Sequence, residues 1–358
     1  MSALLDRMKG AGTIKGAEVL TNASFFKNKS MTNTKIPIIN MAFSGDADGG
    51  MTSGITIISG ESKSFKTLLT LYCLKAYMEE NKDAVCLFYD SEFGTTPEYL
   101  SGFGIDTDKV LHIPIENVEQ LKFDAVKRLE EIKKGDKVFI LVDSLGSLAS
   151  KKEVEDALDE KSVTDMTRAK AIRSFFRIIT PHITMKDIPC FIINHVYKTL
   201  EMFSKDVIPG GTAVTYAANQ IFIITKAQEK DGTELTGYKF TINIHKSRIV
   251  KEKSKFPLIV TFEKGINKWS GLFDVALEGG FITKATAQLY CLVDKTTGEV
   301  LEANKFKRKD KEYSSAFWAD MLKPGTGFSE YIKSEFKLAT SLEISEEVDI
   351  DSILEEDE

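Results

Sequence analysis

Residues 55–67 read ITIISGESKSFKT, an apolar run that passes through a short polar loop into a lysine and a threonine. The run Ile55–Ser59 is rich in β-branched residues and predicts a strand that is buried on both faces of a sheet. A helical pattern follows over Lys66–Glu80. In this order of strand, loop and helix, backbone N–H groups and a helix N-terminus together bind phosphate. The stretch therefore predicts an α/β fold with a nucleotide-binding P-loop.

Each residue type in this loop has an expected task. Lys66 would neutralise the β- and γ-phosphates of ATP, and the Thr67 hydroxyl would coordinate Mg²⁺. Phe65 stands where the motif has a glycine, so we expect a negative φ there and a loop that differs locally. An ordinary strand–helix turn is the alternative interpretation. The expected phosphate cradle consists of Gly60, Glu61, Ser62, Lys63, Ser64, Phe65, Lys66 and Thr67.

Further apolar runs predict the rest of a mainly parallel sheet. Helix-period segments over 119–134 and 164–183 separate some of these runs, which is typical of a sheet covered by helices on both faces. Alternating patterns over 238–245 and 256–262 predict an antiparallel extension. The additional buried strands are expected at Ala84–Asp90, Val138–Asp143, Ile188–Asn194 and Ile221–Thr225.

The chain divides into four expected parts. Residues 1–34 form an N-terminal segment with a helical pattern at Ala3–Lys9, and residues 35–270 form the α/β core. Residues 271–340 form a small α+β domain with a helix at Leu272–Glu278, a hairpin near Asp294–Gly298 and aromatic helical pieces. Residues 341–358 are an acidic tail that we expect to be disordered.

Two acidic residues follow predicted strands and belong to the expected phosphate site. Asp143 ends the run VFILVD, at the ligand side of a parallel sheet, where it could hold the Mg²⁺ that Thr67 contacts. Glu92 lies just after another strand and could orient and deprotonate an attacking water. Taken singly, Asp143 could be a helix cap and Glu92 a solvated loop residue.

Composition excludes several protein classes. Hydrophobic residues at 42% and aromatic residues at 10% exclude global disorder, and no apolar run reaches the roughly 18 residues of a membrane span. The start of the chain has no secretory pattern. Four widely spaced cysteines argue against a zinc site or a disulfide framework. We therefore expect a cytoplasmic protein with reduced thiols.

The charge is unevenly distributed. Residues 343–358 hold nine acidic and no basic residues, which leaves 47 basic and 44 acidic residues, or a net charge of +3, for residues 1–342. The tail could be a solvated end, or a polyanion that competes with nucleic acid for a basic surface of the same chain.

Five stretches of this chain carry a resemblance to one family. They read GESKSFKT, CLFYDSEFGTTPEYL, FILVDSLGSLASKKEVEDAL, IPCFIINH and HKSRIVKEKSKF. In this order they resemble the RecA family of strand-exchange ATPases over most of residues 35–265, and Phe65 is similar to the phage branch of that family. The resemblance implies a RecA-like P-loop ATPase core.

The resemblance also implies roles for individual residues. Glu92 matches the catalytic glutamate, and Tyr99 matches the aromatic residue that stacks on adenine. His195 stands where the family has a glutamine that senses the γ-phosphate, so its chemistry differs. Lys246 and Arg248 match paired cations that reach the γ-phosphate of the neighbouring subunit, as an arginine finger does.

A DNA-binding surface is expected on the helix that begins near Thr164. Lys170, Arg173 and Arg177 are spaced three and four residues apart and share one helix face, which could instead be an ordinary solvated face. The resemblance implies a first DNA loop at Ser150–Ser162 and a second at Val196–Val214. Gly210 and Gly211 in the second loop would let backbone N–H groups approach phosphates.

Two outlying features remain open. The basic cluster Lys305–Lys311 could guide duplex DNA or form a solvated hairpin. Phe25 and Phe26 could pack on their own domain, although in the family the N-terminal segment docks on the adjacent subunit.

These observations predict an ATP-dependent DNA recombinase that uses ATP and Mg²⁺. It would form a helical homo-oligomeric filament on single-stranded DNA and pair it with homologous double-stranded DNA, in recombination, repair and recombination-dependent replication. Single-strand-binding and mediator proteins are expected partners, no membrane is involved, and a phage-encoded chain would act in the host cytoplasm. The alternatives are a RecA-fold hexameric helicase and a nucleotide-switched DNA-binding scaffold with little hydrolysis.

Overall fold

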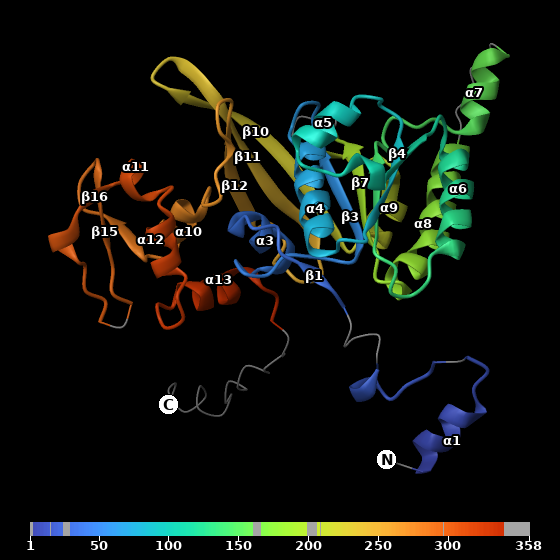
Figure 1. The fold of residues 1–358 in the computed structure, drawn as a ribbon, viewed down its shortest axis with the longest axis horizontal. Coiled ribbons are helices and arrows are strands. Elements are labelled where there is room, and N and C mark those ends of the chain that lie inside the picture. Colours follow the sequence, from blue (N-terminus) through green and yellow to red (C-terminus); the bar gives the residue numbers. More distant parts are fainter. Residues whose placement is uncertain are drawn as a thin grey trace, which may run out of the picture.

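A nine-stranded sheet forms the centre of the computed structural model (Figure 1), in the order β13-β12-β11-β10-β3-β7-β6-β4-β5. The structure describes residues 3–14, 16–23, 29–159, 166–198, 206–207, 209–295 and 297–339. The strands from β10 to β5 run parallel, whereas β11, β12 and β13 continue the sheet antiparallel. The prediction of a mainly parallel sheet with an antiparallel extension is confirmed.

Seven of the nine strands lie where the apolar and alternating patterns predicted them, whereas β5 and β13 were not predicted. They are β3 Gly54–Gly60, β4 Val85–Asp90, β5 Val110–Pro114, β6 Val138–Asp143, β7 Pro189–His195, β10 Gln220–Asp231, β11 Glu234–Ser247, β12 Lys255–Thr261 and β13 Gly265–Ile266. Every residue of β3 and of β6 is buried, which explains why these strands read as continuous apolar runs.

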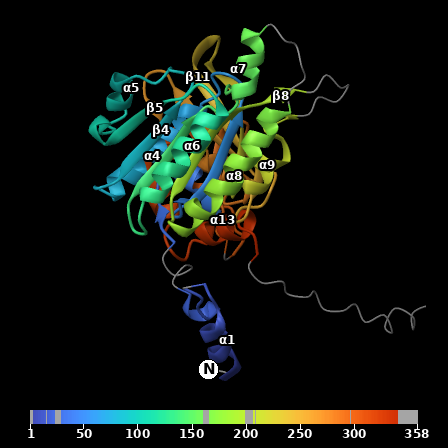
Figure 2. The same cartoon turned by 90° about the vertical axis from the view of Figure 1, so that its right-hand side faces the viewer.

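Helices cover both faces of the sheet (Figures 1 and 2). Neighbouring residues of β3 point to opposite faces, so Ile58 joins the core beneath α4 and Ile57 joins the core beneath α6 and α8. The first face carries α3 Pro37–Ser44, α4 Lys66–Glu80 and α5 Pro97–Gly102; the second carries α6 Val118–Glu131, α8 Thr167–Met185 and α9 Gly211–Ala217. The helix predicted at Lys66–Glu80 has these bounds in the structure.

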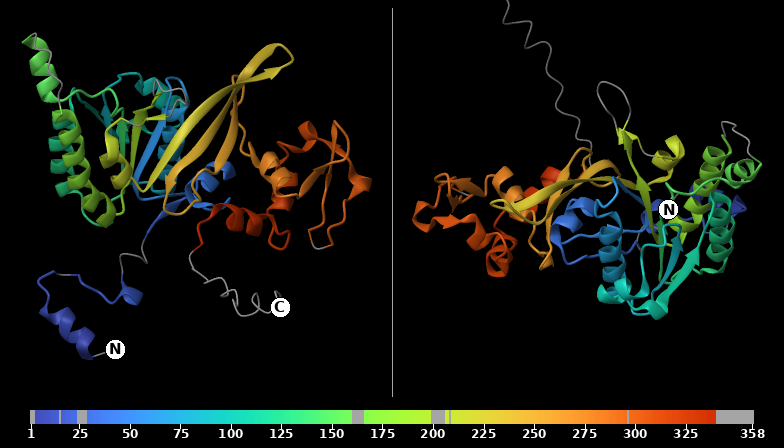
Figure 3. Two further views of the ribbon diagram at one scale, coloured as in Figure 1. Left: turned by 180° about the vertical axis from the view of Figure 1, so that it is seen from behind. Right: turned by 90° about the horizontal axis from the view of Figure 1, so that it is seen from above.

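Several short elements flank the central sheet or lie outside it. The helix α1 Ala3–Ala11 has no buried residue and lies apart from the sheet (Figure 3). The other short elements are β1 Met31–Thr32, β2 Met51–Thr52, α7 Lys151–Leu158, β8 Tyr197–Lys198, β9 Asp206–Val207 and the 3₁₀ turns Leu20–Asn22 and Thr107–Lys109. Phe25 and Phe26 lie outside the described residues.

The small C-terminal unit is α+β, as predicted. It contains α10 Leu272–Glu278, β14 Ile282–Lys284, β15 Leu289–Leu292, a 3₁₀ turn Glu302–Asn304, β16 Phe306–Lys307, α11 Arg308–Lys311, α12 Ser315–Met321 and α13 Phe328–Phe336. The Val293–Val300 bridge closes the expected hairpin. The rings of Phe256 and Phe336, 5.0 Å apart, join this unit to β12. In the described part of the chain, none of the helices is both long and apolar enough for a membrane crossing.

Candidate active site

The P-loop begins at Gly60, the last residue of β3, where the close packing leaves no room for a side chain. A Cβ atom there would lie 2.5 Å from Ser64 Oγ and 2.7 Å from the carbonyl oxygen of Ile224. The loop leads directly into α4, whose first residue, Lys66, is buried. Lys66 Nζ donates a hydrogen bond of 2.7 Å to the carbonyl oxygen of Glu61. Burial lowers the pKa of Lys66, against the opposing charges of Glu92 and Asp143.

Phe65 departs from the expected backbone conformation. Its φ is +75°, so the expectation of a negative φ is wrong. Left-handed backbone costs a non-glycine residue about 1–2 kcal/mol. The Phe65 ring is buried and stacks on Phe240 of β11, with the ring centroids 4.8 Å apart. This packing offsets the strain and holds the loop in the backbone conformation that a glycine would adopt.

Thr67 and Asp143 form the expected pair at the end of β6. Thr67 Oγ1 donates a hydrogen bond of 2.9 Å to Asp143 Oδ2. Burial raises the pKa of Asp143 to about 6, although the Thr67 hydrogen bond opposes this shift. Asp143 Oδ1 is buried and has no hydrogen-bond partner among the described residues. A carboxylate oxygen in this state beside a hydroxyl fits Mg²⁺, which takes few protein ligands and completes its shell with water and phosphate oxygens.

Glu92 lies on the loop that follows β4. Asp90 Oδ1 accepts hydrogen bonds from the backbone nitrogens of Glu92 and Phe93, which fixes the turn. Ser144 Oγ donates a hydrogen bond of 2.6 Å to Glu92 Oε1, and His195 Nε2 lies 2.9 Å from the same oxygen. Partial burial opposes ionisation of Glu92, but these contacts and the charge of Lys66 outweigh it and lower the pKa. Glu92 is therefore ionised near neutral pH.

Most of the expected nucleotide-site residues line one cavity of about 410 Å³, although Gly60 and Glu61 of the expected cradle are not among its lining residues. Tyr99, on α5, contributes an aromatic ring that is 41% exposed, and partial burial raises its pKa. The structure thus brings together residues that lie at the ends of the four strands β3, β4, β6 and β7 or in the segments that follow these strands. They are Lys66, Thr67, Glu92, Tyr99, Asp143 and His195.

Lys246 and Arg248 do not reach this cavity. Lys246 pairs with Ile221, which pairs in turn with Ile57 in the middle of β3, whereas the P-loop follows the carboxyl end of that strand. Lys246 Nζ donates hydrogen bonds to the carbonyl oxygens of Thr215 and Ala218. Arg248 is exposed and lines a different cavity. Their action on a neighbouring subunit stays a prediction.

The three predicted DNA-contacting cations are exposed on α8, as expected from their spacing: Lys170, Arg173 and Arg177. The helix begins at Thr167 instead of near Thr164.

Within the described residues, the two predicted DNA loops are more regular than expected, while residues 160–165, 199–205 and 208 lie outside the description. Helix α7 occupies Lys151–Leu158, because Ser150 and Glu153 form a capping box. The second loop ends earlier, since α9 begins at Gly211 and Gly210 caps it with φ +99°. A Cβ on Gly210 would lie 2.4 Å from Val214 Cγ2, so the helix start itself requires this glycine.

Arg308, within the predicted basic cluster, has a structural role. Its guanidinium lies 2.7 Å from Asp274 and 2.7 Å from Glu312, and packs over the ring of Phe273. These neighbours already neutralise Arg308, so it is not a free cation for DNA.

Some residues of the site were missed from the sequence. Ser144 orients Glu92, and its position after Asp143 was the available signal. Arg168 donates hydrogen bonds to the carbonyl oxygens of Gly146 and Leu148, which tie the start of α8 to the segment after β6. No motif marks Arg168, because its partners are carbonyl groups about twenty residues away.

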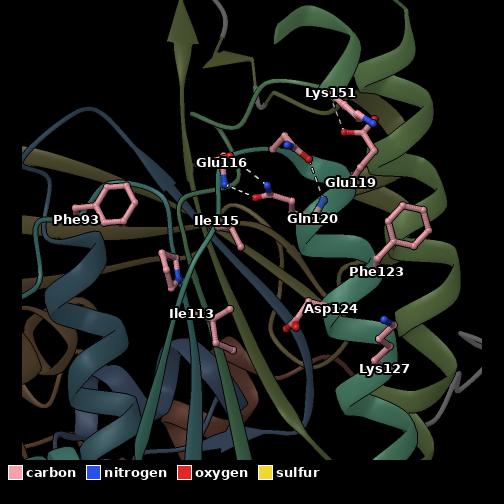
Figure 4. Close-up of a pocket in the computed structure, with 12 residues that line it drawn as sticks. Phe93, Ile113, Ile115, Glu116, Glu119, Gln120, Phe123, Asp124, Lys127 and Lys151 are labelled. Atoms are coloured by element: carbon pink, nitrogen blue, oxygen red, sulfur yellow. Dashed lines mark hydrogen bonds between the residues drawn. The ribbon is translucent and has the colours of Figure 1, made fainter. Parts of the chain in front are cut away.

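Another cavity, of about 720 Å³, lies away from the nucleotide site (Figure 4). It lies beside the edge strand β5 and α6, and Phe93 and Phe123 stand on its two sides. Both rings are more than 60% exposed. It contains no residue of the P-loop.

Comparison with known proteins agrees with this geometry. The RecA N-terminal domain model matches residues 26–267, and the C-terminal domain model of the bacteriophage T4 recombination and repair protein matches residues 269–332. The "Recombination and repair protein" of Enterobacteria phage T4 is 49% identical over 340 residues, which cover 94% of this chain and 87% of that protein. "Protein RecA" of Streptomyces rimosus is 27% identical over 243 residues, which cover 67% of this chain and 63% of that protein. With its P-loop, its strand-end carboxylates and these matches, the chain belongs to the RecA family.

Proposed function

We propose that this chain is an ATP-dependent DNA recombinase, which assembles on single-stranded DNA and exchanges strands with a homologous duplex. The observation that carries the proposal is the convergence of Lys66, Thr67, Asp143 and Glu92 on one cavity in a RecA-family chain. Such a site is suited to hydrolysis of a nucleoside triphosphate.

The proposed chemistry divides between positioning and proton transfer. The loop amides and Lys66 bind the phosphates, and Thr67 and Asp143 would hold Mg²⁺, which supplies charge neutralisation at the phosphates. The Glu92 carboxylate accepts the proton of the attacking water, since hydrogen bonds to its Oε1 fix its orientation. His195, which lies beside that oxygen, is placed to sense whether the γ-phosphate is present.

Lys246 and Arg248 are proposed to act in trans. Because they lie outside the cavity of their own subunit, a contact with nucleotide requires a neighbouring subunit. Two cations supplied in this way would stabilise transition-state charge and make hydrolysis depend on filament assembly.

DNA binding is assigned to the exposed face of α8 and the segment before α9. Lys170, Arg173, Arg177, Gly210 and Gly211 would contact the phosphate backbone, which suits binding without sequence preference. Arg168 links this helix to the segment that carries Ser144, and we propose that these contacts couple DNA binding to hydrolysis.

Self-assembly is assigned to the N-terminal segment, residues 1–34, which would dock on an adjacent core. The exposed Phe93 and Phe123 rings beside edge strand β5 offer an apolar surface for such a contact. Single-strand-binding and mediator proteins are proposed partners. The four cysteines are free, which suits the host cytoplasm as the site of action.

Strand exchange tests the proposal. Purified protein, ATP and Mg²⁺ are incubated with circular single-stranded DNA and homologous linear duplex, and joint molecules are resolved on agarose gels. We expect joint molecules only with the homologous duplex, and none with Lys66→Ala. Closed rings in electron micrographs together with ATP-driven unwinding would instead identify a helicase, and DNA binding without hydrolysis would identify a switched scaffold.

A further inference from the structure

Lys226 lines the nucleotide cavity from the side opposite Glu92. It lies on β10, which pairs with the P-loop strand β3, while Glu92 follows β4 on the other side of β3. The side chain is exposed, and its ammonium lies 3.6 Å from the ring centroid of Tyr238 on β11. Lys226 is therefore a cation at the edge of the phosphate site that no P-loop motif predicts.

The position of Lys226 is built into the sheet. Lys226 pairs with Phe240 across the β10–β11 ladder, and Tyr238 is its diagonal neighbour. Phe240 stacks on Phe65 of the P-loop, so the strand pair that carries Lys226 packs directly against the loop. The Tyr238 ring face attracts the ammonium and limits its motion.

The two carboxylates of the cavity, Asp143 and Glu92, contact side chains other than Lys226, so the Lys226 ammonium is available to a ligand. Asp143 accepts from Thr67, and Glu92 interacts with Ser144 and His195. Among the described residues, no carboxylate oxygen lies within 4.0 Å of Lys226 Nζ. In contrast, the exposed Lys323 forms an ion pair with Asp320. A polyphosphate in the cavity would supply the missing anion.

We propose that Lys226 binds the phosphates of the nucleotide in cis, with Tyr238 as the positioning residue that holds its ammonium. This inference rests on the proposed function, because it deepens the role of the same site. Since Lys226 approaches the P-loop from the side away from Glu92, it contributes to nucleotide binding and not to proton transfer.

The test compares Lys226→Met, Lys226→Gln and Lys226→Arg in the full chain, with Lys230→Met as the matched control on the same strand. Affinities for Mg²⁺–ADP and Mg²⁺–ATP are measured by calorimetry, and KM and kcat by DNA-stimulated hydrolysis. We expect about tenfold weaker nucleotide binding and a higher KM in Lys226→Met and Lys226→Gln, with kcat within about twofold. Lys226→Arg should recover most of the affinity, and Lys230→Met should bind normally.

Unchanged nucleotide affinity in both neutral variants would overturn the inference. An equal loss of nucleotide affinity in Lys230→Met would also overturn it, because that result would show a general effect of charge. A fall of kcat at unchanged KM in the Lys226 variants would overturn it as well. The proposed function fails separately: a wild-type protein that neither binds ATP nor exchanges strands contradicts that function, whereas an active wild type with a silent Lys226→Met contradicts only this inference.

Discussion

His195 Nε2 lies 2.9 Å from Glu92 Oε1, which joins the end of β7 to the loop after β4 across the β6 strand between them. The Ser144 hydroxyl, which follows β6, donates to the same oxygen. One carboxylate oxygen is thus held by groups from the two adjoining strands. Because both contacts are made by Glu92 Oε1, they also fix the orientation of Glu92 Oε2.

Glu92→Gln should separate binding from hydrolysis. The amide keeps the size of the side chain but cannot accept a proton as a base. ATP affinity should remain within about threefold of wild type, while the hydrolysis rate should fall at least ~10²-fold. Nucleotide binding by calorimetry and phosphate release measure the two effects. Near-normal turnover in Glu92→Gln would contradict the assignment of Glu92 as the base.

His195→Phe should move the acid limb of hydrolysis to higher pH. Partial burial would raise the pKa of Glu92, but hydrogen bonds from Ser144 and His195 and the charge of Lys66 hold it below its usual value. Removing the His195 contact leaves burial opposed only by Ser144 and Lys66, so the pKa of Glu92 rises and the base becomes protonated at a higher pH. His195→Gln keeps a donor and should shift the limb less.

The measurement is kcat against pH between about 3.5 and 8, under saturating ATP and DNA, so that the acid limb of the wild type lies inside the window. A second check of the Glu92 pKa is the free energy of unfolding measured as a function of pH. Because the pKa of folded Glu92 is depressed, its stabilising contribution is present above the unfolded value of 4.5 and is lost as pH falls below it. An acid limb that is identical in wild type and His195→Phe would show that His195 does not influence Glu92.

Phe65→Gly should lower stability but keep hydrolysis. Glycine adopts φ +75° freely, which relieves about 1–2 kcal/mol of strain. Loss of a buried phenylalanine costs about 3–5 kcal/mol, so the net free energy of unfolding should fall by about 2 kcal/mol. Urea denaturation and steady-state hydrolysis measure the two properties.

Phe240→Leu is the matched control, since it removes the stacking partner and leaves the P-loop sequence intact. It should also lower stability, by a smaller amount. If Phe65→Gly were more stable than wild type, the packing account of the left-handed Phe65 would be wrong.

The sequence predicts those parts of this fold that depend on local pattern. The bounds of β6 and α4 follow from an apolar run and a helical period, and both lie where they were expected. The conformation of Phe65 could not be predicted, because Phe240, which stabilises it, is far away in the sequence. The structural role of Arg308 could not be predicted for the same reason, since Asp274 neutralises it from another helix.

The missed helix α7 is a different case. Ser150 and Glu153 have the spacing of a capping box, so local sequence contained the signal, and the loop expected from the family resemblance concealed it. Lys226 directly follows Ile221–Thr225, the apolar part of β10 that the sequence predicted. Its place in the nucleotide cavity follows from the pairing of β10 with β11, which brings Lys226 beside Tyr238 and Phe240.

Mixing two inactive variants should restore part of the activity. Lys66→Ala lacks a functional P-loop, and Arg248→Ala lacks the cation proposed to act on a neighbour. Because Arg248 lies outside the cavity of its own subunit, mixed filaments contain some interfaces with an intact P-loop on one side and an intact Arg248 on the other. DNA-stimulated ATP hydrolysis of the mixture should exceed the sum of the separate variants.

Co-assembly of the two variants must be shown by cross-linking or energy transfer between labels. Arg248→Ala mixed with Lys246→Ala is the matched control for mixing itself, because both lesions affect the same half of an interface. Failure of co-assembled Lys66→Ala and Arg248→Ala to complement would place these cations outside the trans active site.

Deleting residues 343–358 should tighten DNA binding most at low ionic strength. This segment carries nine acidic residues beside a body of net charge +3. A tethered polyanion competes with DNA for exposed cations such as Lys170, Arg173 and Arg177, and salt screens this competition over about 10 Å at 0.1 M. Duplex DNA should gain more than single-stranded DNA, and hydrolysis without DNA should stay almost unchanged. A chain of full length whose nine acids are replaced by Asn and Gln separates charge from length, since it should behave like the deletion. If both proteins bind both DNA forms with wild-type affinity at low salt, the tail is only a solvated end.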